Sequence, residues 1–215
     1  MPSQSRKLFR DKLVPDVANL VDTHRKLNPG GHGRRALGHI TRSGVLMLSA
    51  AWELYIEEVL FEGVTFLVEG ADSPDFLPDG VKGKIAQVAK NDKHAFGALK
   101  LCGLGWRTVY ADAVRKDCEN FNTPKFGNIA KLYSDWLNVD QGSFQNSWRH
   151  PPSEINEFIT LRGEIAHRGA DARYVQIKKL TQLKMLVDDL VVDTDRFLSD
   201  HLKDLCNRNR RPWRR

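Results

Sequence analysis

The stretch VLMLSAAWELYIEEVLFEGVTFLV, residues 45–68, decides the fold class. Apolar side chains cover most of its circumference at helical spacing, which is typical of a helix that is buried on nearly all sides. The helix is predicted to run from about residue 35 to residue 69. Ser49, Glu53 and Glu57 recur at every fourth position and form one narrow polar stripe along it. We therefore expect this segment to be the long central helix of a bundle.

The rest of the chain also follows helical periodicity, and no run alternates between apolar and polar residues over the length of a strand. Further helices are predicted over residues 5–27 with a kink or restart at Pro15, over 81–90 and 106–119, from a Thr123 cap and Pro124 to 137, from about 152 to 168, and from 172 or 173 to 206. Trp52, Trp106, Trp136 and Trp148 are expected in the core or in an interface. The sequence thus predicts an all-α bundle with one domain over residues 1–206 and a basic tail over 207–215.

Composition excludes several classes of protein. With 215 residues and 41% apolar residues, the chain is able to bury a sizeable core. Its three cysteines lack the paired spacing of a disulfide framework or a zinc site. The beginning of the chain is polar and basic, unlike a secretory signal, and the longest mainly apolar run, 44–52, is about half of the roughly 20 residues that span a membrane. We expect a cytoplasmic protein with no membrane contact, no metal and no cofactor.

The positive charge is concentrated in the tail. The formal net charge is +6, but without the five arginines of the last ten residues, CNRNRRPWRR, 28 basic side chains face 27 acidic ones. Guanidinium groups pair with phosphates and an indole stacks on bases, so the tail favours a polyanion partner. A solubilising, frayed terminus is the alternative. The candidate nucleic-acid-binding residues there are Arg208, Arg210, Arg211, Trp213, Arg214 and Arg215.

Arg162 interrupts the apolar side of a predicted helix. The apolar stripe of residues 153–168 consists of Ile155, Phe158, Ile159, Ile165 and Ala166. At about 100° per residue, the middle of that stripe falls on Arg162. Burying an unpaired charge costs several kcal/mol, so the guanidinium is expected either to pair with Glu53 or Glu57 or to face a cleft that receives an anion. An internal brace without chemistry is the alternative interpretation.

His167 follows Arg162 by five positions. Because five residues turn a helix by about 140°, the two side chains can converge only if the helix ends near His167. Gly169 favours such an end, since glycine is the usual residue just past a helix terminus. There, His167 is expected to reach the same cleft or to cross to a second subunit.

Arginine and histidine together suit phosphoryl transfer without a metal. Imidazole takes and gives protons near neutral pH, and a guanidinium offers paired donors to the oxygens of a developing phosphorane. RNA supplies the nucleophile itself, through its 2′-hydroxyl. The spacing alone is a weak signal, because the pairs 25/32, 34/39 and 196/201 share it. Of these, Arg34 with His39 is a reserve candidate.

Three segments resemble one known family. ITLRGEIAHRG, residues 159–169, resembles the R-x4-6-H signature of the HEPN superfamily. RSGVLMLSAAWELYIEEVL, residues 42–60, resembles the "AAWE.Y" helix of its RiboL-PSP subgroup, and FNTPKFGNI, residues 121–129, resembles the connector of that subgroup. One residue departs from the pattern: the position after the motif arginine is commonly polar, and here it is Gly163.

The resemblance implies a helical bundle that forms a homodimer through the motif helices. Catalytic members are metal-independent endoribonucleases, often toxins or defence effectors, so RNA and an antitoxin or defence-system partner are implied. On the matching positions, Arg162 stabilises the phosphate, His167 is the general acid or base, and Glu53 supports the site. Arg168 joins the candidate RNA contacts.

Two other functions stay open at this stage. The first is a non-catalytic HEPN dimerisation or scaffold module in which Arg162 braces the dimer. The second is an RNA-binding module that works mainly through the arginine tail, with affinity that falls steeply with salt.

Overall fold

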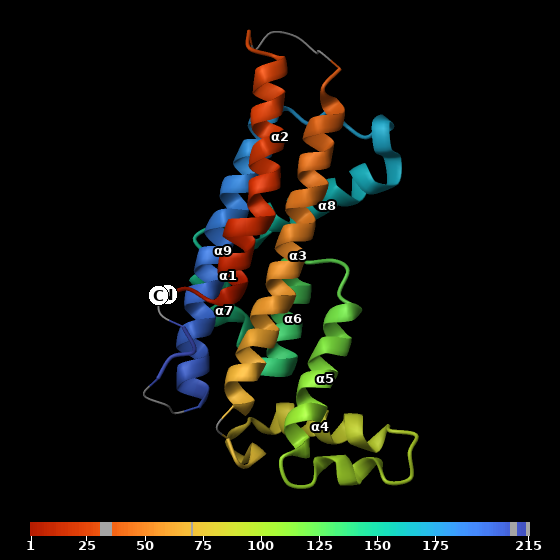
Figure 1. Ribbon diagram of the computed structural model, residues 1–215, viewed down its shortest axis with the longest axis vertical. Coiled ribbons are helices and arrows are strands. Elements are labelled where there is room, and N and C mark those ends of the chain that lie inside the picture. The colour runs from red at the N-terminus through yellow and green to blue at the C-terminus, as the bar shows by residue number, and fades with distance from the viewer. Residues whose placement is uncertain (31–35, 70, 207–209, 214–215) are drawn as a thin grey trace.

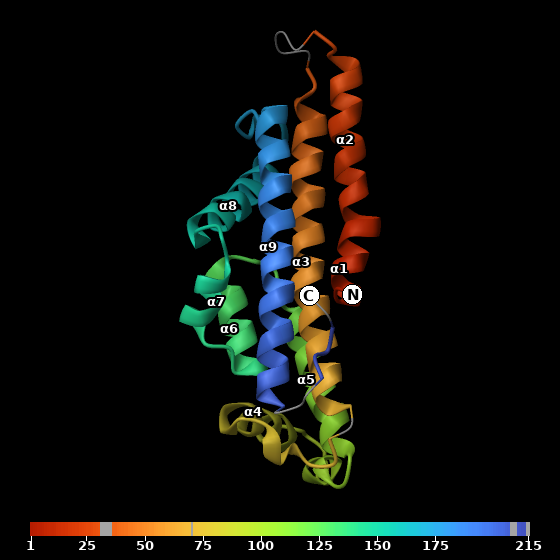
Figure 2. The ribbon, with the colours of Figure 1, turned by 90° about the vertical axis from the view of Figure 1, so that its left-hand side faces the viewer.

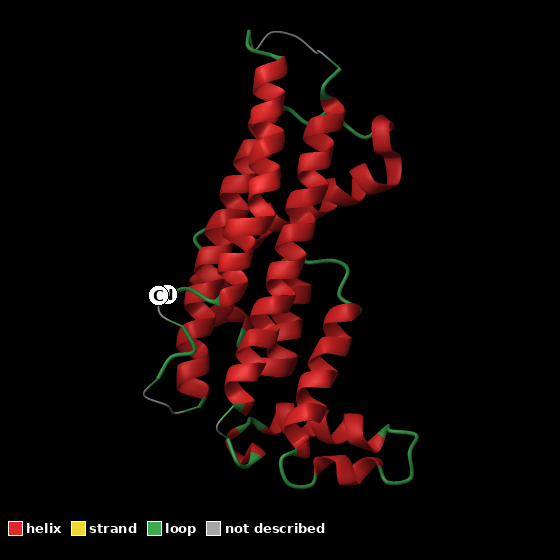
Figure 3. Ribbon diagram, in the orientation of Figure 1, coloured by secondary structure: helices red, strands yellow, loops and turns green. Residues whose placement is uncertain are grey.

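The computed structural model describes residues 1–30, 36–69, 71–206 and 210–213. Every regular element within those residues is a helix, which confirms the predicted all-α class (Figure 3). None of the described helices is both long enough and apolar enough to cross a bilayer.

Helix α3, Gly38–Val68, is the axis of the bundle. It contacts most of the other helices, namely α1 (Gln4–Leu8), α2 (Val14–Leu27), α5 (Gly105–Glu119), α6 (Phe126–Leu137), α8 (Pro152–Arg168) and α9 (Ile177–Leu205) (Figure 1). Trp52, Ile56 and Leu60 are completely buried on it. The prediction of a long central helix is confirmed.

Two glycines of α3 permit the close approach of α9. A Cβ atom on Gly44 would lie 2.5 Å from Cδ2 of Leu180, and one on Gly63 would lie 3.0 Å from Cδ1 of Leu202. Both leucines are fully buried. A larger residue at Gly44 would therefore force the Leu180 side chain to shift, and one at Gly63 would crowd Leu202.

The first predicted helix is interrupted just before its proline. Residues Phe9–Leu13 form a turn of π-helix between α1 and α2, in which the Val14 N–H donates to the carbonyl oxygen of Phe9. Pro15 has no N–H and its ring crowds the preceding turn, so the wider π turn accommodates it. The predicted restart at Pro15 is confirmed.

Short elements and α4, Asp79–Lys90, cover the C-terminal end of α3. The 3-10 turns Pro74–Phe76 and Gly97–Leu101 flank α4, and the Arg107 side chain of α5 donates to the carbonyl oxygen of Ala71 (Nε–O 3.0 Å). The helix α7, Gln141–Ser147, was not predicted. Its Phe144 is buried against Phe126 and Trp148.

Two predicted helix starts lie too early, that of α6 by two residues and that of α9 by four or five. α6 begins at Phe126, after Lys125, and its first N–H is capped by Asn156 of α8 (N–Oδ1 3.0 Å) and not by Thr123. The carbonyl oxygen of Pro124 accepts a hydrogen bond from Trp52 Nε1 instead. α9 begins at Ile177, because the preceding segment is extended and buries Ala172 and Val175.

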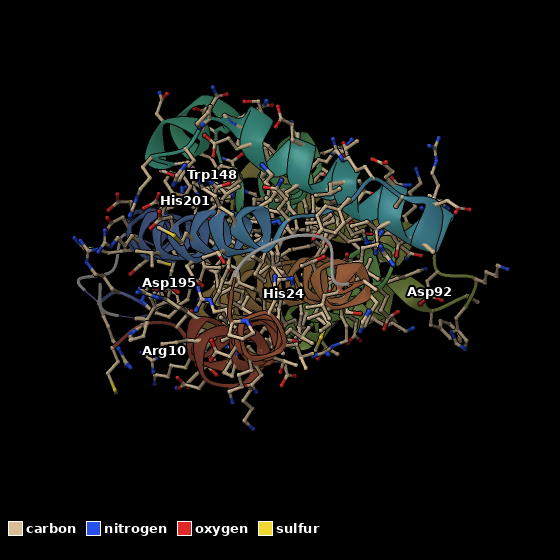
Figure 4. All side chains as sticks on the ribbon, turned by 90° about the horizontal axis from the view of Figure 1, so that it is seen from above. Arg10, His24, Asp92, Trp148, Asp195 and His201 are labelled. Atoms are coloured by element: carbon tan, nitrogen blue, oxygen red, sulfur yellow. The ribbon has the colours of Figure 1, made fainter. Side chains whose placement is uncertain are left out.

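The tail returns to the body of the protein at Trp213, which is only 6% exposed. Its indole Nε1 donates to the carbonyl oxygen of Asp195 (2.8 Å), and its own carbonyl oxygen accepts from Ser199 Oγ (2.6 Å). The Asp195 carboxylate is buried between α9 and the N-terminal helices, where Ser3 Oγ donates to it and Arg6 lies 3.5 Å away (Figure 4). The domain boundary after residue 206 stays a prediction.

Replacing Trp213 with alanine is expected to destabilise the protein by about 3 kcal/mol, because a buried indole and its packing are lost. Chemical denaturation followed by circular dichroism measures this. Arg210→Ala, an exposed neighbour, is the control and should change the unfolding free energy by less than about 0.5 kcal/mol. Equal stability of both variants would contradict the packing of the tail.

Candidate active site

Arg162 lies at the margin of the core and not inside it. The apolar residues Ile155, Phe158 and Ile159 of α8 are buried against the bundle. The Arg162 side chain is 37% exposed, and its Nη2 lies 4.0 Å from Oε2 of Glu53 on α3. Glu53 is thus the partner among the two carboxylates, Glu53 and Glu57, that the sequence offered. The contact is at the limit of an ion pair, so the guanidinium keeps most of its donors for another anion.

The packing of α8 ends close to Arg162. Ile165 is the last buried residue of α8, and Ala166 is exposed although it lies in the predicted apolar stripe. A Cβ atom on Gly163 would meet no heavy atom within 4 Å. The space beside Arg162 is therefore open at Gly163, where a side chain, a substrate or a second chain has room.

His167 stands in the last turn of α8 and is exposed. The helix ends one residue later at Arg168, and Gly169 follows with φ 54°, as the sequence predicted. However, the helix is unbroken between Arg162 and His167, so the two side chains point about 140° apart. Among the described residues, no hydrogen bond or ion pair joins them. The structure brings Glu53 to Arg162 but leaves His167 on its own.

The polar stripe of α3 is partly buried, and this shifts its carboxyl groups. Burial raises the pKa of Glu57 to about 7, and repulsion from Glu53 and Glu58 adds to the shift. Burial also raises the pKa of Glu53, against the attraction of Arg162, which lowers it. Ser49 continues the stripe into the core, where its hydroxyl has no hydrogen-bond partner in the described part of the chain. The sequence indicated this stripe but not that Glu57 would titrate near neutrality.

One side of α3 near Glu53 is apolar and exposed. Leu46 and Met47 are 36% and 39% exposed, and Ala50 is exposed one turn further along. Burial on nearly all sides was predicted here, so that expectation is wrong for this face. The signal that could have found it is the polar stripe with Glu53 and Glu57, since carboxylates favour the side of a helix that water reaches.

The described tail residues differ in how accessible their side chains are. Trp213, which was predicted to stack on a base, is buried in the fold, so its ring is not available for stacking in this structure. Arg211 pairs with Asp200 of α9, whereas Arg210 and Arg168 are exposed. Arg208, Arg214 and Arg215 lie outside the described residues, as does Arg34 of the reserve pair. The other tryptophans, Trp52, Trp106, Trp136 and Trp148, are buried in the core as predicted.

The comparison with protein families agrees with these elements. A model of the RiboL-PSP-HEPN family matches residues 13–200, which include α3, the connector before α6, and all of α8. The chain belongs to the RiboL-PSP-HEPN family. It is therefore a member of the HEPN superfamily. Comparison with curated proteins and with solved structures gives no match.

The raised pKa of Glu57 predicts a pH-dependent stability. Its pKa is higher in the fold than in the unfolded chain, so the neutral form is favoured and stability is lost as the pH rises through about 7. Glu57→Gln should therefore stabilise the protein by about 1 kcal/mol at about pH 8.5, after allowance for solvent screening, and by much less at about pH 5.

Denaturant unfolding at the two pH values measures the effect. Glu119→Gln, an exposed glutamate at the end of α5, is the matched control and should show no such difference. If Glu57→Gln is equally stable relative to the native protein at both pH values, Glu57 is an ordinary surface carboxylate.

Proposed function

We propose that this protein is a metal-independent endoribonuclease. The ribose 2′-hydroxyl attacks the adjacent phosphorus, and the bond from phosphorus to the 5′-oxygen breaks. The proton of the 2′-hydroxyl passes to a base, and the departing 5′-oxygen takes a proton from an acid. The products are a 2′,3′-cyclic phosphate and a 5′-hydroxyl.

The observation that carries this proposal is the position of Arg162. It is held at a core margin by Glu53 at 4.0 Å, yet more than a third of its side chain is open to solvent beside the empty space at Gly163. A guanidinium in such a place stabilises the extra charge of a phosphorane through paired hydrogen bonds. His167 supplies the proton transfer, for which an imidazole is suited near neutral pH.

Arg162 and His167 project from different sides of α8, and this separation favours a site shared by two chains. We propose a homodimer in which the exposed apolar face of Leu46, Met47 and Ala50 on α3 packs against the same face of a second copy. That arrangement sets the two α8 helices side by side, so that His167 of one chain and Arg162 of the other flank one phosphate. An enzyme of this kind fits a toxin or defence effector, and we propose that an antitoxin or defence-system partner restrains it.

Substitution of either motif residue should abolish cleavage. In the presence of a chelator, His167→Ala and Arg162→Ala are each expected to cleave single-stranded RNA at least about 100-fold more slowly, which is the usual size of a general acid–base or oxyanion contribution. Gel electrophoresis with end-group analysis measures the rate and identifies the 2′,3′-cyclic phosphate.

Two exposed residues provide matched controls. His94→Ala removes an imidazole from a loop, and Arg25→Ala removes a guanidinium from the end of α2; both should cleave at the native rate. Cleavage by His167→Ala at the native rate would remove His167 from the mechanism.

The Glu53 contact favours one alternative, a scaffold without catalysis in which the pair stabilises the fold or the dimer. Arg162→Lys separates the two functions, because lysine keeps the charge opposite Glu53 but not the paired donors. Under the nuclease proposal, Arg162→Lys loses most cleavage while its thermal stability and oligomeric state stay close to native. Under the alternative, the native protein binds RNA or a partner and cleaves nothing.

The dimer has its own test. Met47→Glu places a charge in the proposed apolar interface and should shift the protein to the monomer, with at least a tenfold weaker dimer. Analytical ultracentrifugation measures the dissociation constant. Met185→Glu on α9, where the methionine is 62% exposed, is the control and should leave the oligomeric state unchanged.

A further inference from the structure

A hollow of about 540 Å³ opens between α8 and the start of α9. α8 contributes Glu157, Phe158 and Leu161, and the extended segment that leads into α9 contributes residues 173–176; Lys179 of α9 completes the wall. Figure 2 shows α8 and the first turns of α9 side by side at this end of the molecule. The volume of the hollow falls within the usual range of small-ligand sites.

The hollow combines an apolar floor with polar walls. Phe158, Leu161 and Val175 are buried at its base, and the ring of Tyr174, which is 40% exposed, stands at the rim. Gln176 offers an amide donor and acceptor, and Glu157 offers an acceptor. A nucleobase needs this combination, because its faces stack on apolar or aromatic groups and its edge forms hydrogen bonds.

Positive charge gathers at the rim of the hollow. Arg173 is largely exposed and lies 3.3 Å from Glu164, its acidic partner. Lys178 and Lys179 are exposed and form no ion pair with any described residue. The first turn of α9 also holds no acidic residue, so nothing there offsets the positive end of the helix dipole. A phosphate beside the hollow would therefore be attracted.

The hollow lies beside the half of α8 that leads to its motif end, although Arg162, His167 and Arg168 do not line it. Leu161 in its floor directly precedes Arg162, and Arg168 lies two turns further along the same face, because seven residues return to the same side of a helix. His167 is the neighbour of Arg168. A strand that starts in the hollow and follows these exposed side chains reaches the proposed catalytic residues.

We propose that this hollow binds one unpaired nucleotide of the RNA substrate, with the base against Phe158, Leu161 and the Tyr174 ring and with its phosphates on Lys179 and Arg173. The identification of the ligand as RNA rests on the proposed function. A base within a duplex has its edge occupied by the partner strand, so the hollow selects single-stranded RNA.

The test measures the binding of a short fluorescein-labelled single-stranded RNA to the full chain carrying His167→Ala, by fluorescence anisotropy over a series of salt concentrations. Tyr174→Leu should weaken binding about tenfold, as loss of one stacked base predicts, whereas Tyr174→Phe should stay within about twofold of the parent. Lys179→Ala should weaken binding and reduce the slope of log affinity against log salt by about 0.7. A duplex of the same sequence should bind more weakly.

Lys90→Ala is the matched control, since Lys90 is exposed at the far end of the molecule on α4. It should leave the affinity and the salt slope at parent values. Circular dichroism melting of each variant separates a loss of binding from a loss of folding. A photocrosslink from a thiouridine in the RNA to the peptide that contains Tyr174 would support the assignment directly.

The outcomes separate this inference from the proposed nuclease activity. If the native protein cleaves RNA while the Tyr174 and Lys179 variants bind as the parent does, the hollow is not a nucleotide site and the nuclease proposal stands. If the native protein cleaves nothing but binds with the predicted losses, the hollow is a nucleotide site and the nuclease proposal fails. If polyglutamate competes as strongly as RNA and Tyr174→Leu has no effect, the hollow only attracts anions without specificity, and the inference is overturned.

Discussion

Burial of α3 on most of its circumference is the constraint from which the rest of the structure follows. The other helices surround α3 because most of its side chains are apolar and are buried away from solvent. Gly44 and Gly63 permit the close approach of α9. A helix in that position has few places for charge. Its carboxylates therefore stand where the cover is incomplete, and Glu53 pairs there with Arg162 at the edge of the core.

The two motif residues of α8 differ in how firmly the fold holds them. Arg162 is positioned by the packing of α8 on α3 and by a carboxylate, so its direction is set before any ligand arrives. His167 projects from the final turn of the helix, beyond the last buried residue, Ile165. Its orientation depends on whatever else covers that end of α8. The single chain therefore holds Arg162 beside Glu53 but does not hold His167 against any other described residue.

The parts of the fold that follow from periodicity were predictable, and the parts that depend on partners distant in the sequence were not. The central helix, the restart at Pro15 and the end of α8 at Gly169 were all indicated by local residues. The partner of Arg162 was narrowed to Glu53 or Glu57, because its place in an apolar stripe called for a carboxylate, and the structure selects Glu53. The start of α6 was not, since Asn156 from another helix caps it. Burial of Trp213 was equally invisible, because an indole in an arginine-rich segment looks exposed until Asp195 and Ser199 are placed beside it. The hollow beside α9 was not predictable, because it depends on the extended conformation of residues 173–176, which were predicted to be helical.

The Asp195 cluster has a consequence for the chain as a whole. Ser3 and Arg6 from the beginning and Trp213 from the end meet on the same turn of α9, and Met1, Pro2 and Trp213 line one shared hollow. The described ends of the polypeptide are thus neighbours, as Figure 2 shows. Because these two ends lie close together, a short linker could join them. New termini in the exposed turn after α4 would then give a circular permutant that retains every helix of the bundle.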